Sequence, residues 1–475
     1  MLIGRQKEIN TLKHCYESDK SEFIAVYGRR RVGKTYLIKE LFEEKFVFFS
    51  TGILHGDKNA QLNAWNAQMT RYGGAAIAAA GNWFEAFENL RTLIERASLN
   101  GTSAEKKVIF LDEIPWIATM HSGFLKWLDY FWNSWASSRG DIMLIICGSA
   151  ASWIIDNVVN DRGGLHNRLT RQILVAPFNL SECELFFKSH NIPLTRYQIA
   201  EAYMIFGGIP YYLSLMDPKY SLYQNVDKMY FAQDAELQNE FDNLYRSLYK
   251  NSGNYTRVVE SIAGKGIGST RADIVADTKI DDGGSLTKIL RDLSISGFIR
   301  EYKAYGKKKR DSLYQLVDFF SLFDIRFRGR RAEFSDDYWL RFSSTSAHSV
   351  WRGFAYEKLC LLHIPQIRQK LGIAGVLTSV FSWRGGYEDD GAQIDLVIDR
   401  NDNVINLCEI KFASGEYTID KNYHESLRRK KSAFIYSTNT RKAALITMIT
   451  TFGLTRNMYS AEIVSEVTLD DMFAI

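Results

Sequence analysis

The stretch that decides the fold of the N-terminal part of the chain is Gly28-Arg29-Arg30-Arg31-Val32-Gly33-Lys34-Thr35. It fits the pattern GxxxxGK[ST], a loop whose backbone N–H groups surround phosphate oxygens. An apolar run typical of a strand, residues 23–27, precedes the loop, and a helical pattern, residues 35–42, follows it. We therefore expect the whole loop to bind ATP, with Lys34 reaching the β- and γ-phosphates and the Thr35 hydroxyl binding Mg²⁺.

The next apolar run that is typical of a buried strand, residues 108–112, ends in two carboxylates, Asp112 and Glu113. Asp112 is predicted to hold Mg²⁺, and Glu113 to orient or deprotonate the attacking water. A third apolar run, residues 142–147, ends just before Ser149, which is placed to sense the γ-phosphate. Continuous apolar runs are typical of parallel strands buried on both faces, so the sequence predicts an α/β domain with a parallel sheet.

Composition limits the classes of protein that remain. The chain has 475 residues, 46% of them hydrophobic and 24% charged, and a formal net charge of +4. At roughly 150 residues per domain, about three domains are expected. A near-neutral charge excludes a uniformly basic chromatin protein. No signal-peptide segment or bilayer-spanning run is seen, and five scattered cysteines lack metal-ligand spacing, so we expect a cytoplasmic protein with reduced thiols and no membrane partner.

After the region expected to form the parallel sheet, the sequence pattern becomes mainly helical. Residues 178–240 have helical patterns, broken at Gly207-Gly208-Ile209-Pro210. Residues 241–330 hold three short helical patterns and then a basic hairpin. The expected parts are a helix at 255–263, a second helix capped by Ser269 or Thr270, a third capped by Ser285 and ended by Gly297, strands at 298–305 and 312–317, and a basic turn at 306–311.

This order predicts a winged helix-turn-helix with a basic wing. Lys and Arg at the tip of such a hairpin neutralise DNA phosphates without reading bases. Two alternatives remain at this point: a solvated turn inside a spacer between domains, and a module that serves only as a docking surface for protein.

The C-terminal part contains a hairpin with unusual carboxylates. Two apolar strands, residues 393–399 and 404–411, flank a polar turn. If the turn is centred on Asp402, Asp395 faces Glu409, and Glu409 shares its face with Lys411. Like charges opposite each other on an apolar hairpin are unfavourable, and a divalent metal removes the penalty. Oxygen ligands suit Mg²⁺ or Mn²⁺, and Lys411 would stabilise an attacked phosphate or assist a metal-bound water.

Several blocks together resemble one family. The phosphate-binding loop, FLDEIPW, ICGSAASW and GGLHNRLTR resemble a P-loop ATPase family that is widespread in archaea, occurs in bacteria, and belongs to the AAA-like and STAND-like NTPases. The resemblance places the opening segment, residues 3–9, beside the nucleotide and makes Gly208-Ile209-Pro210 the GxP element of a helical lid. It also implies an arginine finger or sensor arginine among Arg162, Arg168 and Arg171, with Arg168 as the first choice.

The order Asp…Glu-x-Lys resembles the PD-(D/E)XK nuclease fold, a small α/β domain of restriction-endonuclease type. Archaeal relatives of the ATPase carry a similar, DUF234-like domain at the C-terminus. The resemblance adds Glu357, from a first helix, to Asp395 and Glu409 as a metal ligand, and makes Lys411 catalytic. A later helix with Arg428-Arg429-Lys430-Lys431 would follow a nucleic-acid backbone. The alternative is a degenerate fold that cuts nothing and holds a salt-bridge cluster.

The sequence thus predicts four parts: a P-loop ATPase core at 1–177, a helical lid at 178–240, a winged helix at 241–330 and a nuclease-like domain at 335–475. The first hypothesis is an ATP-binding, Mg²⁺-dependent ATPase that couples nucleotide state to DNA binding and to the nuclease-like domain. Hydrolysis would be slow unless a neighbouring subunit or a partner protein supplies an arginine. The second hypothesis is a nucleotide-controlled regulatory or docking switch with an inactive last domain. A third is a transposition or phage-defence ATPase that works with another gene product.

Overall fold

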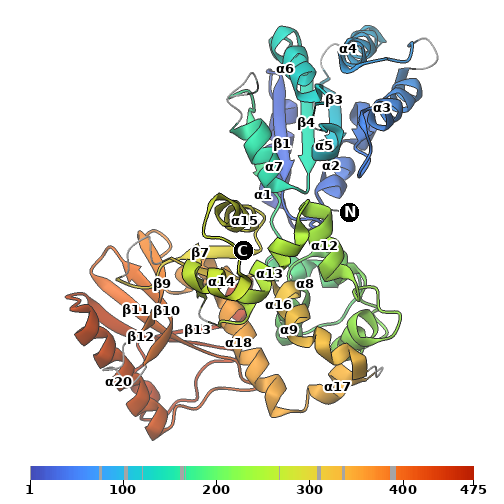
Figure 1. The fold of residues 1–475 in the computed structure, drawn as a ribbon. Coiled ribbons are helices and arrows are strands. Elements are labelled where there is room, and N and C mark those ends of the chain that lie inside the picture. Colours follow the sequence, from blue (N-terminus) through green and yellow to red (C-terminus); the bar gives the residue numbers. More distant parts are fainter. Residues whose placement is uncertain are drawn as a thin grey trace. The chain divides into compact units, whose positions relative to one another are not determined.

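The computed structural model describes residues 2–73, 77–100, 105–119, 121–160, 165, 167–266, 268–306, 312–333, 337–385 and 392–474. The chain divides into two compact units, Met1–Pro177 and Phe178–Ile475 (Figure 1). The predicted ATPase core ends at the same residue as the first unit. The predicted lid, winged helix and last domain lie together in the second unit.

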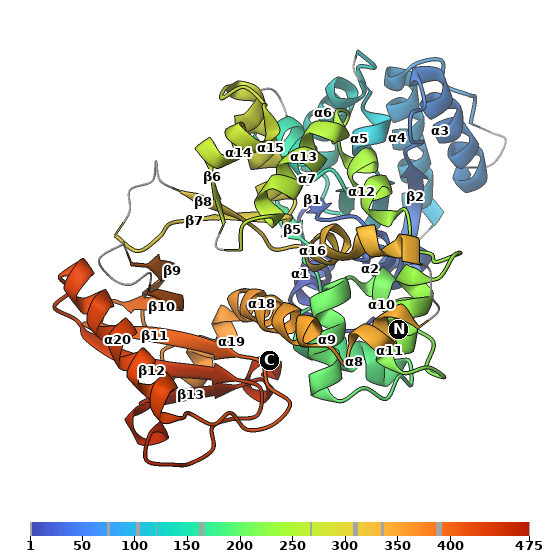
Figure 2. The ribbon, with the colours of Figure 1, turned by 60° about the horizontal axis from the view of Figure 1, so that its bottom comes forward.

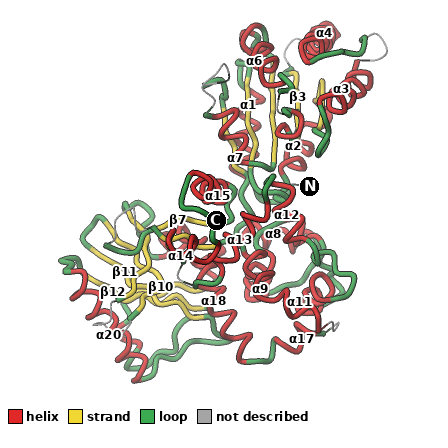
Figure 3. The backbone as a smooth tube through the Cα atoms, in the orientation of Figure 1, coloured by secondary structure: helices red, strands yellow, loops and turns green. Residues whose placement is uncertain are grey.

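The first unit is built on a five-stranded parallel sheet with the order β2-β3-β4-β1-β5, so the predicted α/β class is confirmed. The strands alternate with helices along the chain (Figure 3). The elements are α1 (Gln6–Glu17), β1 (Glu22–Tyr27), α2 (Lys34–Phe42), β2 (Phe46–Thr51), α3 (Lys58–Gly73), α4 (Trp83–Asn100), β3 (Lys107–Asp112), α5 (Ile114–Ile117), α6 (Phe124–Ser134), β4 (Ile142–Gly148), α7 (Ala151–Ile154) and β5 (Arg171–Leu174).

The strand order decides where the site lies. Strand β4 is inserted between β1, which leads into the phosphate-binding loop, and β3, which leads into the two carboxylates. Every residue of β3 and β4 is buried, as expected for strands covered on both faces. Because parallel strands all end at one edge of a sheet, the loop, the carboxylates and Ser149 meet at that edge.

The second unit begins with helices and a small sheet. The helices are α8 (Leu180–Ser189), α9 (Arg196–Phe206), α10 (Pro210–Ser214), α11 (Leu222–Val226) and α12 (Glu240–Leu248), followed by α13 (Ser252–Ala263), α14 (Arg271–Thr278) and α15 (Gly284–Ile295). The sheet has the order β6-β8-β7, with β6 (Ser269–Thr270), β7 (Ile299–Tyr302) and β8 (Leu313–Leu316). Three helices and a hairpin therefore follow in the predicted order.

Two details of this region test the expected helix caps. Thr270 caps α14, in a capping box with Asp273, as one of the two predicted residues. The prediction that Ser285 caps α15 is wrong, because the helix already begins at Gly284 and the extended Gly283 precedes it. Gly297, in a left-handed conformation, follows the end of α15. The basic tip of the hairpin, residues 307–311, lies outside the described residues.

The rest of the second unit is a mixed five-stranded sheet with the order β13-β12-β11-β10-β9. Strands β9, β10 and β11 are antiparallel, whereas β12 and β13 continue parallel to β11. Helices α18 and α20 lie on opposite sides of the sheet (Figure 2). The elements are α16 (Phe319–Phe327), α17 (Tyr338–Phe342), α18 (Ser346–Leu362), α19 (Ile364–Lys370), β9 (Thr378–Arg384), β10 (Gln393–Arg400), β11 (Val404–Lys411), α20 (Lys421–Thr438), β12 (Ala443–Thr450) and β13 (Ser465–Thr468).

The predicted hairpin register is confirmed where the strands pair. Leu396 lies opposite Cys408, and Asp399 opposite Ile405, which centres the turn on Asp402. All five cysteines of the chain are buried free thiols. Among the described helices, none combines the length and apolar character needed to cross a bilayer.

A buried histidine makes the second unit sensitive to acid. The ring of His363, which follows α18, has Nδ1 2.8 Å from the Leu359 carbonyl oxygen, and its Nε2 accepts a hydrogen bond from the Leu180 N–H at 3.3 Å. Protonation would replace that acceptor with a donor. Burial accordingly lowers the pKa of His363 from 6.5 to about 4.

We expect His363 to contribute stability to the second unit that is lost as the pH falls from 6.5 to about 4, whereas the raised pKa of Glu409 acts in the opposite direction. In this window the unfolded state binds more protons than the folded state, so the free energy of unfolding decreases by about 3 kcal/mol. Urea unfolding at pH 7 and pH 4 measures the effect. The variant His363→Gln should show a flatter dependence on pH, and an unchanged slope would contradict this role of His363.

Candidate functional site

The phosphate-binding loop needs glycine at two positions for different reasons. At Gly28, φ is +147° and an added Cβ would lie 2.3 Å from the Val175 carbonyl oxygen, which leaves no room for a side chain. At Gly33, φ is +89°, a left-handed conformation that ends the loop and begins α2. The N–H groups at the start of α2 therefore point toward the loop and favour an anion there.

Lys34 lies inside this loop and is 5% exposed. Its Nζ donates hydrogen bonds to the carbonyl oxygens of Gly28, at 3.0 Å, and Arg29, at 2.9 Å. The same Nζ lies 3.3 Å from the Ser149 hydroxyl oxygen. A cation fixed beside the start of a helix gives the loop the charge that a polyphosphate requires.

Thr35 and Asp112 form the oxygen side of the site. The Thr35 hydroxyl donates a hydrogen bond of 2.8 Å to Asp112 Oδ2, although the residues lie 77 positions apart in the chain. A hydroxyl and a carboxylate in contact are the hard oxygen ligands that Mg²⁺ prefers, so this pair fits the ion that the sequence predicts. The structure brings both residues together at the carboxyl edge of the sheet.

Glu113 is held in place by Ser149, at the end of the inserted strand. Its Oε1 accepts a hydrogen bond of 2.7 Å from the Ser149 hydroxyl, and its Oε2 accepts one of 3.2 Å from the Ser149 N–H. Because Ser149 also lies against Lys34, one small side chain links the cation of the loop to the predicted catalytic carboxylate. Ser149 is thus at the predicted edge, and its contact with Glu113 is a feature that the motifs alone did not predict.

The opening segment of the chain contacts the phosphate-binding loop through Arg5. Arg5 is 5% exposed and donates a hydrogen bond of 3.1 Å to the Val32 carbonyl oxygen, in the loop itself. It also donates to the carbonyl oxygen of Ala176, at the end of the first unit. Sequence reasoning placed the segment near the nucleotide but did not single out Arg5. Arg29 is also buried, whereas Arg30 and Arg31 are partly exposed on the loop.

The predicted finger arginine does not reach this site in its own chain. Arg168 is exposed in the turn before β5. Thr170 hydrogen-bonds Phe23 at the start of β1, so the segment lies at the edge of the sheet opposite the loop. Arg171 opens β5 near that same edge and bonds the Thr170 carbonyl oxygen. Arg162 lies outside the described residues. As a finger, Arg168 could serve only another molecule.

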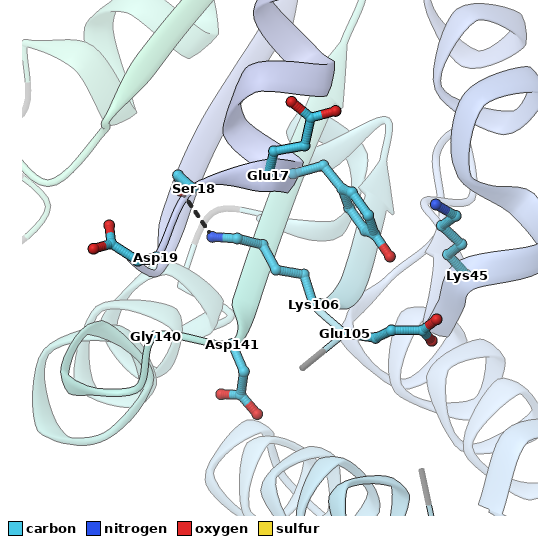
Figure 4. A pocket seen from close by; sticks show the side chains of 9 residues that line it. Glu17, Ser18, Asp19, Lys45, Glu105, Lys106, Gly140 and Asp141 are labelled. Atoms are coloured by element: carbon cyan, nitrogen blue, oxygen red, sulfur yellow. Dashed lines mark hydrogen bonds between the residues drawn. The ribbon is translucent and has the colours of Figure 1, made fainter. Parts of the chain in front are cut away.

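A pocket of about 610 Å³ opens at this opposite edge, formed by the segments that precede the strands (Figure 4). Lys106 lies in it, and its Nζ donates a hydrogen bond of 2.9 Å to the Ser18 hydroxyl. Burial lowers the pKa of Lys106. Acidic side chains from three segments, Glu17, Glu105 and Asp141, share the pocket. The pocket lies at the other edge of the sheet from the phosphate-binding loop and contains both acidic and basic side chains, so it is not part of the nucleotide site.

The C-terminal carboxylates have their own set of contacts. Glu409 is 3% exposed, and both of its oxygens accept hydrogen bonds of 2.7 Å from Lys430 Nζ. The Tyr423 hydroxyl donates a third, of 3.1 Å. Asp395 Oδ2 accepts a hydrogen bond of 3.0 Å from the Ile410 N–H, across the hairpin. Lys411 Nζ lies 5.1 Å from the centre of the Tyr423 ring.

The carboxylates influence one another without forming one ligand group. Burial, and then Asp395, raise the pKa of Glu357 to about 7, and the same two causes raise the pKa of Glu409. In the described part of the chain, however, no group of three His, Cys, Asp or Glu side chains could hold a metal ion. The prediction that Glu357, Asp395 and Glu409 together bind a metal stays a prediction. In this arrangement the Lys430 ammonium neutralises Glu409.

Sequence reasoning missed Lys430 and Tyr423 as partners of Glu409. It assigned Lys430 to a basic surface, together with its neighbours on α20. The two residues are seven positions apart, which is two helical turns, so they share one face of the helix. That spacing was the available signal.

The match to a protein family covers the first unit and the start of the second. Residues 2–216 match a family described as an ATPase domain predominantly from Archaea. The chain belongs to this ATPase family. It is an ATP-binding P-loop protein, and an uncharacterized ATP-binding protein of Methanocaldococcus jannaschii is 44% identical to it over 45 residues, which are 10% of this chain and 76% of that protein.

More distant similarities extend over most of the chain. An uncharacterized protein of Methanocaldococcus jannaschii is 22% identical over 437 residues, 91% of this chain and 92% of that protein. A Walker-type ATPase of Pyrococcus abyssi is 17% identical, with a TM-score of 0.48 over 68% of this chain and 96% of its own. The ORC2 protein of Aeropyrum pernix is 13% identical, with a TM-score of 0.42 over 70% of this chain and 94% of its own.

Proposed function

We propose that this ATPase uses its nucleotide state to control the binding and processing of nucleic acid by its second unit. The observation that carries the proposal is the grouping of Glu357 from α18, Asp395 from β10, and Glu409 and Lys411 from β11. Glu357 and Asp395 line one pocket, and Asp395, Lys411 and Glu409 each influence the pKa of Glu357. Carboxylates can hold a divalent ion, and a lysine can stabilise the charge of an attacked phosphate, so this grouping suits a site that handles phosphodiesters.

The order of the elements supports the same proposal. Helix α18 precedes three antiparallel strands, and after helix α20 the strand β12 returns parallel to β11. This helix–three strands–helix–strand order resembles the PD-(D/E)XK fold. Upstream, three helices and a hairpin follow the order of a winged helix-turn-helix. Arg428 and Arg429 are exposed on α20 and offer positive charge to a phosphate backbone.

In the first unit, hydrolysis depends on four residues around the loop. Mg²⁺ bound by Thr35 and Asp112 would neutralise charge that develops on the phosphates. Lys34 binds the β- and γ-phosphates, and Glu113 accepts a proton from the attacking water. Because Ser149 contacts both Lys34 and Glu113, a change in how Lys34 is bound is passed directly to Glu113. The finger is supplied by another molecule, for which the exposed Arg168 is our candidate.

One observation favours a second candidate function. Lys430 satisfies both oxygens of the buried Glu409, an arrangement that a stable, non-cutting domain can keep. In that case the second unit binds nucleic acid or a partner protein, and the chain is a nucleotide-controlled docking switch.

The deciding experiment measures binding and cleavage by the full chain. Fluorescent single- and double-stranded DNA is incubated with Mg²⁺ or Mn²⁺, with and without ATP. We expect cleavage that Asp395→Asn abolishes, and ATP dependence that Lys34→Ala abolishes. Asp402→Asn, on the exposed turn of the same hairpin, is the matched control and should cut normally. ATP-dependent binding without cleavage would establish the docking switch, and DNA binding that ignores ATP would refute the coupling.

A further inference from the structure

A pocket of about 280 Å³ in the second unit is walled by two different modules. One wall comes from α18 and β10, which carry the nuclease-like carboxylates. The other comes from the small sheet of the predicted winged helix. The residues that matter here are Glu357, Lys358 and Asp395 on the first wall, and Arg300, Tyr302 and Gln315 on the second.

The two walls are joined by backbone contacts, so the pocket is a fixed feature of the unit. Beyond β7, the chain continues beside β9, where Ala304 bridges Ser382 and the Tyr305 N–H bonds the Ser382 carbonyl oxygen at 3.0 Å. A second contact comes from Lys358 on α18, whose Nζ donates a hydrogen bond of 2.6 Å to the carbonyl oxygen of Gly266, just before the small sheet.

Two cations face this pocket from opposite walls. Lys358 is 4% exposed. Arg300 donates through Nε to Gln315 Oε1 at 2.8 Å, and its guanidinium lies 4.7 Å from the centre of the Tyr302 ring. Burial lowers the pKa of Arg300, and burial together with the nearby Arg300 lowers the pKa of Lys358 to about 7. The ion pairs found among the described residues include neither cation. Two basic side chains in a partly desolvated pocket favour an anion between them, because the anion offsets the cost of keeping both of them charged.

We propose that Arg300 and Lys358 form a phosphate-binding subsite that receives one terminal nucleotide of a nucleic-acid strand beside Glu357 and Asp395. The pocket, of about 280 Å³, is slightly smaller than the range of about 300–1,000 Å³ that is usual for ligand sites, so it can take no more than one nucleotide. A duplex does not fit, because its major groove alone is about 12 Å wide. The subsite names a substrate for the proposed nuclease reaction and in that respect rests on the proposed function. The binding of a phosphorylated strand end does not depend on that reaction.

This inference names the substrate class as a phosphorylated strand end. The winged-helix wall would then select substrate as well as hold DNA, since two of the phosphate contacts come from different modules. Removing either cation should weaken binding because a charge-assisted hydrogen bond to phosphate is lost.

The test uses single-stranded tetradeoxythymidylate labelled with fluorescein at one end and carrying a phosphate or a hydroxyl at the other. All proteins carry Lys34→Ala, so that the nucleotide loop of the first unit does not contribute. Fluorescence anisotropy should show that a phosphorylated end binds about tenfold more tightly than a hydroxyl end. Arg300→Gln and Lys358→Met should each remove this preference, whereas Lys219→Gln, at an exposed lysine of the same unit, should keep it.

Equal affinity for the two ends, or a preference that survives Arg300→Gln, would overturn the subsite. Arg300 is only partly buried, so this variant decides the matter if Lys358→Met fails to fold. The outcomes also separate the two proposals. A phosphate preference in a chain that never cleaves DNA supports the subsite and refutes the nuclease. DNA cleavage by a chain that lacks the phosphate preference supports the nuclease and refutes the subsite.

Discussion

Replacing Glu113 with glutamine is expected to lower the rate of ATP hydrolysis by about 100- to 10,000-fold, the usual contribution of a positioned general base. Glutamine keeps the size of the side chain and can still accept a hydrogen bond from Ser149, but it cannot accept a proton from water. ATP binding should persist, because Lys34, Thr35 and Asp112 are unchanged. Phosphate release under saturating ATP measures the rate, and calorimetry with ATP measures the binding.

The control for this variant is Glu105→Gln, which changes an exposed carboxylate at the opposite edge of the same sheet. It should hydrolyse ATP at the normal rate. A Glu113→Gln protein with unchanged hydrolysis would show that another group takes the proton. Loss of ATP binding in that variant would show instead that Glu113 shapes the loop, through Ser149, rather than the water.

Replacing Lys430 with methionine is expected to lower the free energy of unfolding of the second unit by about 3–5 kcal/mol at pH 7, the cost of leaving a buried charge without its partner. The effect is large because Glu409 is 3% exposed and both of its oxygens bond Lys430. Urea unfolding of the full chain measures it.

The loss should grow as the pH rises. Burial raises the pKa of Glu409 above its ordinary 4.5, so the folded state binds more protons than the unfolded state, and the free energy of unfolding falls with increasing pH. Without Lys430 the pKa of this carboxyl rises further, which extends the fall to higher pH. Lys430→Met should therefore be closest to the parent protein in acid and furthest from it above neutrality.

Two further variants make this result specific. Arg429→Met removes an exposed neighbouring cation and should cost little. Glu409→Gln combined with Lys430→Met should recover much of the lost stability, because no buried charge remains. If Lys430→Met were no worse than Arg429→Met, the ion pair would contribute nothing to folding. Stabilisation of Lys430→Met, but not of the parent, by Mn²⁺ would show that a metal can replace the ammonium.

The features that could be predicted from the sequence depend on interactions between residues that are close together in the chain. The phosphate-binding loop is local, since Gly33 must adopt a left-handed φ and Lys34 must begin a helix wherever that motif occurs. The hairpin register around Asp402 is nearly local, because the position of the short polar turn fixes which residues of the two strands pair. The capping of α14 by Thr270 depends on a residue three positions away.

The remaining features join segments that are distant in the chain. Ser149 links Lys34 to Glu113 only because β4 is inserted between β1 and β3, an order of strands that their apolar patterns do not encode. Arg168 lies at the wrong edge for its own site because the segment before β5 pairs with the start of β1.

The sequence by itself therefore determined the ATP loop, the carboxylates that follow β3 and the alternation of strands and helices. Only the tertiary structure decided which groups meet the charged side chains: Ser149 at Glu113, Lys430 at Glu409, and Arg300 and Lys358 around one pocket. The physical reason is that a motif specifies backbone conformation over a few residues. Burial and charge pairing depend instead on which distant side chains the packed elements bring within hydrogen-bond distance.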